Sequence, residues 1–128
     1  MAHLLVAGKL HPMGVARLEA LNAEGVEVTY IEEIDEPSYA DHIVTADALI
    51  IRTQPLSAAT IARAERLKVV SRHGVGYDAV DVAALNARGI PLAIVGDVNS
   101  VSVAEQAMMQ LLAGAKQAIR ADHAVRNP

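Results

Sequence analysis

The sequence predicts an α/β domain in which five parallel strands form one sheet, and two observations support this prediction. Five short runs rich in Val, Ile, Leu and Ala are nearly continuous in apolar character, which is typical of strands buried on both faces. Segments with apolar residues at helical spacing lie between these runs. Regular alternation of the two patterns favours βα units that share a parallel sheet with flanking helices.

The alternating segments occupy roughly the first three quarters of the chain. The predicted strands are Leu4–Ala7, Val26–Ile31, Ala48–Arg52, Lys68–Arg72 and Leu92–Val95. Helical spacing of apolar residues is found within Met13–Leu21, Tyr39–Val44, Ile61–Leu67 and Val80–Leu85. Gly25 and Gly89 follow two of these helices, where a left-handed C-terminal cap favours a residue without a Cβ. Five such βα units predict a flavodoxin-like layout.

The segment from Val101 to Arg120 contains no strand-like break and predicts one long helix. Ser102 and Glu105 match a capping box, in which each side chain satisfies a backbone donor at the helix start. The apolar stripe of this helix is broad and comprises Ala104, Met108, Leu111, Leu112, Ala115 and Ile119, widened by Val103, Ala107 and Met109. We expect it to pack on another domain or on a second copy in a homodimer through residues 101–120, with packing on its own sheet as the alternative.

Composition excludes several classes of function. The chain of 128 residues is 52% hydrophobic, yet no apolar run approaches the roughly 18 residues that cross a bilayer. Its net charge is −4, its eleven basic residues are scattered and only 2% of residues are aromatic, so no surface for nucleic acid is expected. Cysteine is absent and no export signal is visible. These features predict a cytoplasmic protein with neither membrane nor nucleic-acid partners.

A glycine motif follows the fourth predicted strand. Residues Gly74 to Ala79 match G-x-G-x-x-G/A and precede Asp97 at the end of the next strand, as in a dinucleotide fingerprint. That fingerprint belongs on the first strand of a nucleotide-binding half, whereas here little sheet remains after it. A smaller anion such as a carboxylate is favoured, held by amides between a strand end and a helix start. Alternatively, the glycines only permit a sharp turn and Asp78 caps the helix.

Three segments together resemble the D-2-hydroxyacid dehydrogenase family, of the type related to phosphoglycerate dehydrogenase. They are Ile51–Leu56, Ser71–Asp81 and Val98–Glu105, and their order and spacing also match. The resemblance implies an oxidoreductase that interconverts 2-hydroxy and 2-oxo acids with NAD or NADP. It also implies that residues 1–99 form the substrate-binding domain and that residues 100–128 contain the crossing helix that begins a nucleotide-binding domain.

The same resemblance assigns five substrate-binding residues. The backbone amides of Val75 and Gly76, in the turn opened by Gly74, would hold the substrate carboxylate, and Asn99 would border the cleft. Arg52 would meet a distal phosphate or carboxylate in phosphoglycerate-type members, with a surface ion pair as the alternative for this arginine. His73 is expected at the rim, and the remaining histidines show no metal-ligand spacing.

The departure from the family concerns the end of the sequence. The chain stops at Pro128, before the position of the family's own cofactor loop and of its catalytic arginine and histidine–acid pair. The substrate domain of the family is also completed by a segment that returns from the C-terminus. We therefore expect no catalytic residue, no bound cofactor and no activity from this chain alone, with NAD or NADP bound by a full-length parent enzyme.

Other functions compete with this one. A free-standing module that binds a metabolite or dimerises without catalysis would use the same glycine loop and helix, and direct dinucleotide binding at Gly74–Gly76 is a further alternative. A phosphoacceptor receiver domain needs acids after the first strand and an Asp at the end of the third, where this chain has Gly8, Lys9 and Arg52. The identity of the hydroxy acid is not determined by the sequence.

Overall fold

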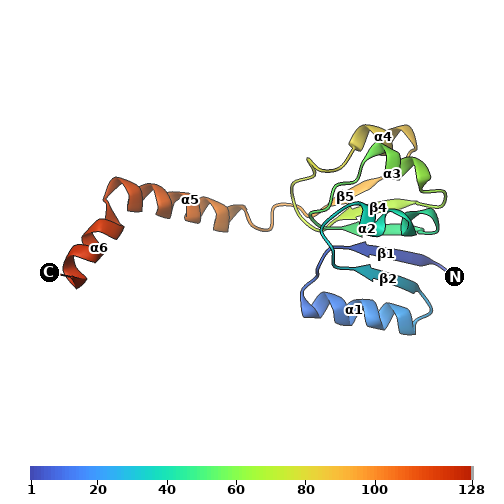
Figure 1. The fold of residues 1–128 in the computed structure, drawn as a ribbon, viewed down its shortest axis with the longest axis horizontal. Helices are drawn as coiled ribbons and strands as arrows, with labels where there is room; N and C mark the ends of the chain where they lie inside the picture. The colour runs from blue at the N-terminus through green and yellow to red at the C-terminus, as the bar shows by residue number, and fades with distance from the viewer. Residues whose placement is uncertain (128) are drawn as a thin grey trace. The chain divides into compact units, whose positions relative to one another are not determined.

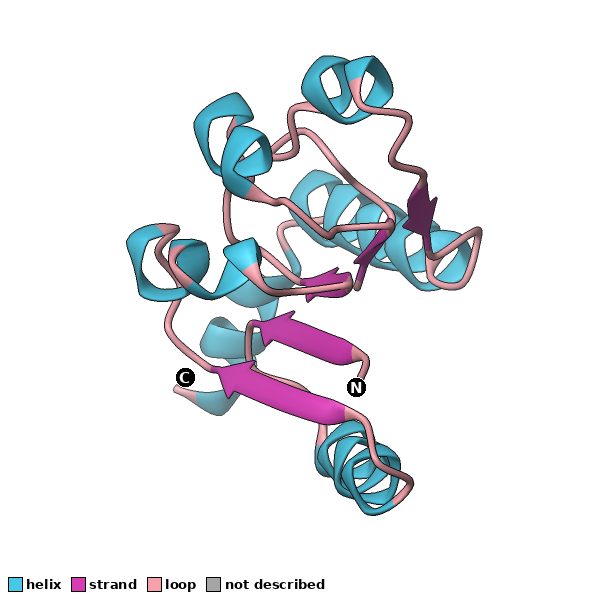
Figure 2. Ribbon diagram, turned by 90° about the vertical axis from the view of Figure 1, so that its right-hand side faces the viewer, coloured by secondary structure: helices cyan, strands magenta, loops and turns pink. Residues whose placement is uncertain are grey.

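The computed structural model describes residues 1–127, which divide into two compact units. The first unit is Met1–Val95, and the second begins at Gly96. The first unit holds a five-stranded sheet with helices on either side of it (Figure 1, Figure 2). The second unit consists of two consecutive helices.

The sheet is entirely parallel and has the strand order β2-β1-β3-β4-β5. Its strands are β1 His3–Ala7, β2 Glu27–Ile31, β3 Ala48–Ile51, β4 Val69–Arg72 and β5 Leu92–Ile94. All five predicted strands are present, with ends within one residue of the predicted ones. The flavodoxin-like α/β fold class is therefore confirmed, because a doubly covered parallel sheet requires the continuous apolar runs seen in the sequence.

The first unit has four α-helices and a short 3₁₀ segment. They are α1 Pro12–Ala23, α2 Pro37–Ala40, η1 His42–Val44, α3 Ala58–Arg63 and α4 Val82–Ala87. The Ser57 hydroxyl accepts the Thr60 N–H at the start of α3, which satisfies a donor that the first helical turn leaves free. Gly25 and Gly89 have φ of 91° and 65° after α1 and α4, as predicted for left-handed caps.

The core lies on one face of the sheet. Leu5, Leu49, Ile51 and Val70 alternate with residues of the opposite face, and all four are almost fully buried. They pack against side chains from the helices and loops on that face, including Tyr39, Ile43, Ile61 and Leu85. The Tyr39 hydroxyl donates to the Pro55 carbonyl. Burial raises the pKa of the Tyr39 phenol above its ordinary value. The opposite face is less covered, since Leu4, Ile50 and Val69 are only partly buried.

The second unit differs from the single long helix that the sequence predicts. It contains α5 Ser100–Ala115 and α6 Ala118–Arg126, and Gln117 between them is left-handed with φ of 50°. A left-handed residue interrupts the helical hydrogen-bond ladder, so the Gln117 N–H donates to the Gly114 carbonyl three residues back. The prediction of one helix over 101–120 is therefore wrong beyond Ala115.

The predicted capping box at the start of this helix is also wrong. Helix α5 begins at Ser100, two residues before Ser102, and Asn99 occupies the N-cap without a side-chain cap bond. Among the described residues, neither Ser102 nor Glu105 donates or accepts a side-chain hydrogen bond. Ser102 is inside the first turn, because the Val103 N–H already donates to the Asn99 carbonyl at 2.9 Å.

A charged cluster ties the amino ends of three strands together. Asp47 precedes β3, and its carboxylate accepts the His3 N–H at 2.9 Å, Arg66 at 2.8 Å and Lys68 at 3.2 Å. The His3 ring lies between the hydroxyls of Thr45 and Thr29. The His3 backbone N–H, opposed by burial and aided by the two cations, lowers the pKa of Asp47 to about 2.

This cluster predicts acid sensitivity of the fold. Because the folded pKa of Asp47 lies below its unfolded value of about 4, its stabilising contribution is complete above that pH. The contribution is lost as the pH falls from about 4 to about 2. We expect Asp47→Asn to lower the free energy of unfolding at neutral pH and to flatten its decline over this window in urea titrations. Glu65→Gln, at an exposed position, is the matched control, and an unchanged pH dependence in D47N would contradict the assignment.

Candidate functional site

Three loops leave the carboxyl ends of adjacent strands and meet at one edge of the sheet. Ala7 of β1 is paired with Ile51 of β3, which is paired with Arg72 of β4. Beyond these pairs, the Arg52 N–H donates to the Ala7 carbonyl at 3.0 Å and the His73 N–H donates to the Ile51 carbonyl at 2.7 Å. The carboxyl edge of a parallel sheet is where open α/β folds bind ligands.

The loop after β1 is held tightly to this edge. The Gly8 N–H donates to the Ile31 carbonyl at 2.8 Å, and the Leu10 N–H donates to the Tyr30 hydroxyl at 3.0 Å. Tyr30 in turn donates to Glu32 at 2.9 Å, and burial, partly offset by the Leu10 N–H, raises the pKa of this phenol. The loops after β1 and β2 are therefore fixed to each other before any ligand is present.

Gly8 allows the loop after β3 to approach closely. Its φ is 114°, and a Cβ at this position would lie 2.6 Å from the Arg52 Cβ and 2.8 Å from the Gln54 Oε1. Any side chain would therefore push apart the loops that carry the candidate site. Local sequence does not reveal this role of Gly8, because the contact joins residues 44 positions apart in the chain.

Arg52 is exposed at the edge of the sheet and bonds to backbone. Its Nη1 donates to the Lys9 carbonyl at 2.9 Å. Within residues 1–127 it forms no ion pair with a carboxylate, so the surface ion pair considered as an alternative is not present. A guanidinium has five N–H donors in a planar fork, and most of those of Arg52 remain available to an anion.

The glycine loop begins a run of free backbone amides that starts at Val75 and Gly76 and continues to Ala79. The Gly74 N–H donates to the Arg72 carbonyl at 2.9 Å, and the Gly74 carbonyl accepts the Val95 N–H at 3.2 Å. In the part of the chain that the structure describes, the N–H groups of Val75 and Gly76 donate to no other group, and both residues are exposed. Such adjacent free donors suit an anion like a carboxylate.

The expectation that this loop opens a helix directly is wrong. Helix α4 begins only at Val82, and its N-cap is Asp81, whose carboxylate accepts the Ala84 N–H at 2.9 Å. Asp78, proposed as the cap, is exposed and lies before the helix. The intervening residues are held by Leu56, which bonds to Ala79 and Asp81 at 2.9 Å each and forms a bridge with Val80. The helix start on which a dinucleotide fingerprint depends is therefore displaced from the glycines.

Arg72 is a functional candidate that the sequence analysis missed. It is the last residue of β4, is only partly exposed, and its Nη1 donates to the His73 carbonyl at 2.8 Å. The guanidinium lies over Gly74, where a Cβ would be 2.8 Å from Nη1. Its place directly before the glycine motif was the available signal. Arg52 and Arg72 thus provide two guanidinium groups at the ends of neighbouring strands.

The remaining predicted residues contribute less to this grouping. The structure places Arg52, Gly74, Val75 and Gly76 along one edge of the first unit, whereas Asn99 belongs to the second unit, immediately before α5. The His73 side chain is exposed, consistent with a rim position.

Among residues 1–127, no three His, Asp or Glu side chains lie close enough together to hold a metal ion. The described helices include none that is long and apolar enough to span a bilayer.

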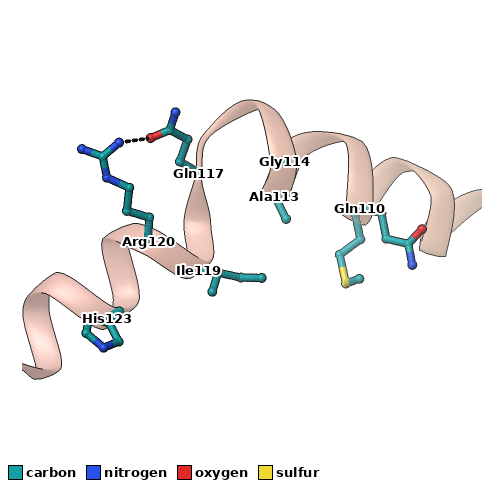
Figure 3. Close-up of a pocket in the computed structure, with 8 residues that line it drawn as sticks. Gln110, Ala113, Gly114, Gln117, Ile119, Arg120 and His123 are labelled. Atoms are coloured by element: carbon teal, nitrogen blue, oxygen red, sulfur yellow. Dashed lines mark hydrogen bonds between the residues drawn. The ribbon is translucent and has the colours of Figure 1, made fainter.

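A large hollow lies elsewhere, within the second unit. The bend between α5 and α6 forms an open hollow of about 910 Å³ that is lined by both apolar and polar residues (Figure 3). Its lining includes Met109 and Ala113 of α5 and Ile119 and His123 of α6. None of the predicted substrate-binding residues lines this hollow, so its size does not make it the site of chemistry.

The fold and the edge of free donors define an α/β domain suited to a small anionic ligand. A model of the D-isomer specific 2-hydroxyacid dehydrogenase family, catalytic domain, matches residues 4–124. The chain belongs to this family, as the three sequence segments indicated.

Curated relatives agree with this assignment. D-3-phosphoglycerate dehydrogenase of Mycobacterium tuberculosis is 38% identical over 124 residues, which are 96% of this chain and 23% of the relative. The same-named protein of Methanocaldococcus jannaschii is 34% identical over 117 residues, 91% of this chain and 22% of the relative. The chain therefore spans less than a quarter of the length of these relatives.

Solved structures share the fold. The TT0316 protein of Thermus thermophilus superimposes with a TM-score of 0.78 at 27% identity, over 98% of this chain and 40% of that one. An NAD-dependent formate dehydrogenase of Staphylococcus aureus, in complex with NAD, has a TM-score of 0.79 at 23% identity, over 94% of this chain and 40% of that one. The latter similarity concerns the fold alone.

The close approach at Gly8 predicts a large effect of a single methyl group. We expect Gly8→Ala to lower the free energy of unfolding by about 2–4 kcal/mol, because it combines a disfavoured φ with overpacking. Gly25→Ala is the matched control, since Gly25 also has positive φ but a Cβ there would meet nothing within 4 Å, and it should cost about 1 kcal/mol. Equal losses for the two variants in urea unfolding would contradict the packing argument.

Proposed function

We propose that this chain is the substrate-side part of an NAD- or NADP-dependent oxidoreductase that acts on the CH–OH group of a small 2-hydroxy acid resembling 3-phosphoglycerate. Residues 1–99 would form its substrate-binding domain, and residues 100–128 would begin its nucleotide-binding domain. The single observation that carries the proposal is the pair of free amides at Val75 and Gly76, flanked by two guanidinium groups on the same edge of the sheet.

The chemistry of a phosphorylated hydroxy acid matches these donors. Its carboxylate is planar with two acceptor oxygens, which suits the adjacent N–H groups of Val75 and Gly76. Its phosphate carries more charge and suits the fork of a guanidinium, as offered by Arg52 and Arg72. Both arginines are anchored to backbone carbonyls rather than to carboxylates, so an anion does not have to compete with an internal ion pair.

The described residues do not fit a dinucleotide. The glycine loop is separated from the start of α4 by five residues, Tyr77–Asp81, so no helix N-terminus faces the free amides. We therefore assign NAD or NADP to a part of the enzyme outside these residues, together with the groups for hydride and proton transfer. Asn99 would border the cleft where substrate and cofactor meet, and the 128-residue chain alone would be inactive.

Calorimetric titration with phosphohydroxypyruvate and, separately, with NADH tests this proposal. We expect the oxo acid to bind weakly and NADH not to bind. Arg52→Ala should weaken oxo-acid binding about tenfold or more, because a charge-assisted hydrogen bond is lost. Arg17→Ala, at an exposed arginine of α1, should leave binding unchanged. Saturable NADH binding that Gly76→Leu abolishes would instead establish the glycine loop as a dinucleotide site.

We further propose that residues 101–120 join two copies of the chain in a homodimer. Every residue of α5 except Ala113 is exposed, and the exposed side chains include Val103 at 59%, Met108 at 55% and Leu111 at 64%. An apolar stripe of this length is costly in water, and burial between two copies would remove it from solvent.

The dimer proposal predicts a concentration-dependent molecular mass. In sedimentation equilibrium we expect the chain to self-associate, and the double variant Met108→Glu, Leu111→Glu to remain monomeric, because burying two carboxylates in an apolar contact is unfavourable. Gln106→Glu adds a carboxylate to the polar side of the same helix and should leave association intact. A monomer at all concentrations would contradict the proposal.

A further inference from the structure

Gln54 is a buried polar residue beside the candidate anion site, and nothing in the proposed chemistry uses it directly. Only 1% of it is exposed. Its Oε1 accepts the Thr53 N–H at 2.9 Å, and its Nε2 donates to the Glu33 carbonyl at 2.7 Å. The carboxamide also lies against Gly8, within 3.0 Å of where a Cβ would be. One side chain therefore connects the loops that follow β1, β2 and β3.

These contacts converge on the backbone of Arg52. The Arg52 N–H is held by the Ala7 carbonyl, and the next N–H, that of Thr53, is held by Gln54. The Arg52 Cβ is in contact with Gly8, and its guanidinium donates to the carbonyl of Lys9, the residue after Gly8. The direction in which Arg52 leaves the sheet is thus set on one side by β1 and on the other by Gln54.

We propose that Gln54 is a positioning residue that fixes Arg52 in the orientation that receives the substrate's distal anion. The inference rests on the proposed function of Arg52. An ordered arginine loses less side-chain entropy on binding, so fixing it in advance favours the anion. The side chain at position 54 must offer one acceptor and one donor without net charge, since it meets the Thr53 N–H on one side and the Glu33 carbonyl on the other. A carboxamide meets both requirements, whereas a carboxylate cannot donate.

The test is an NMR titration with sulfate, observed at the Arg52 Nε–H signal, using Gln54→Met and Gln54→Glu. Sulfate keeps its charge between about pH 5 and about pH 8, so changes in affinity come from the protein. Gln54→Met keeps the volume but lacks both hydrogen bonds, and we expect about tenfold weaker binding at either pH. Gln54→Glu should bind weakly at about pH 8 and recover at about pH 5, because burial at this position raises the pKa of a carboxyl above its ordinary value of about 4.3 and the protonated acid again has a donor and an acceptor.

The charged or titratable residues in or next to the segments that Gln54 touches, or on the adjacent end of β4, are common to the wild type and both variants; they are Lys9, Tyr30, Glu32, Glu33, Arg52, Arg72 and His73. The wild-type pH profile therefore provides the baseline for their effects. Gln106→Glu, the same substitution at an exposed position of α5, should follow that baseline.

Each outcome decides the inference. If calorimetric titration shows that Arg52→Ala leaves sulfate binding unchanged, Arg52 is not an anion ligand and the proposed function fails first. If Arg52→Ala weakens binding but Gln54→Met does not, or if only Gln54→Glu weakens it, positioning by Gln54 is overturned and charge alone accounts for the effect. Loss of the folded far-ultraviolet circular dichroism spectrum in both Gln54 variants would also overturn it, because the residue would then support the whole domain rather than Arg52.

Discussion

The parallel pairing of β1, β3 and β4 is the constraint on which the candidate site depends. Because these strands run in the same direction and in register, Ala7, Ile51 and Arg72 lie side by side and the loops that follow them begin at one edge. Strand pairing alone thereby brings the loops after Ala7, Ile51 and Arg72 together, although these residues are far apart in the chain. The candidate binding groups are then backbone amides and arginines that are already fixed to that edge.

The two ends of the sheet serve different purposes. At the amino end, the Asp47 carboxylate accepts the His3 N–H and forms ion pairs with Arg66 and Lys68, so its charge is paired within the fold. At the carboxyl end, Arg52 and Arg72 bond only to carbonyls and keep donors free. A charge that is internally paired contributes to stability, whereas one that is left available contributes to recognition.

The chain belongs to the D-isomer specific 2-hydroxyacid dehydrogenase family, and this membership bears on the difference between the two ends of the sheet. Under the proposed function, the domain would hold an anionic substrate against groups supplied from elsewhere, and a turn with free amides would do so at little conformational cost. The apolar stripe of α5 and the partly covered sheet face at Leu4, Ile50 and Val69 are both surfaces that further protein would bury.

The sequence by itself determined the five strands, the fold class, the glycine caps at Gly25 and Gly89 and the family, because buried parallel strands and left-handed turns leave local patterns. It placed the start of α4 and the continuity of α5 wrongly. Asp78 and Asp81 are equivalent caps by local pattern, and only the contacts of Leu56 with Ala79 and Asp81 select the second. The contacts of Gly8 and Gln54 were likewise decided by tertiary structure, since they depend on which strands lie adjacent, and local sequence carries no record of that.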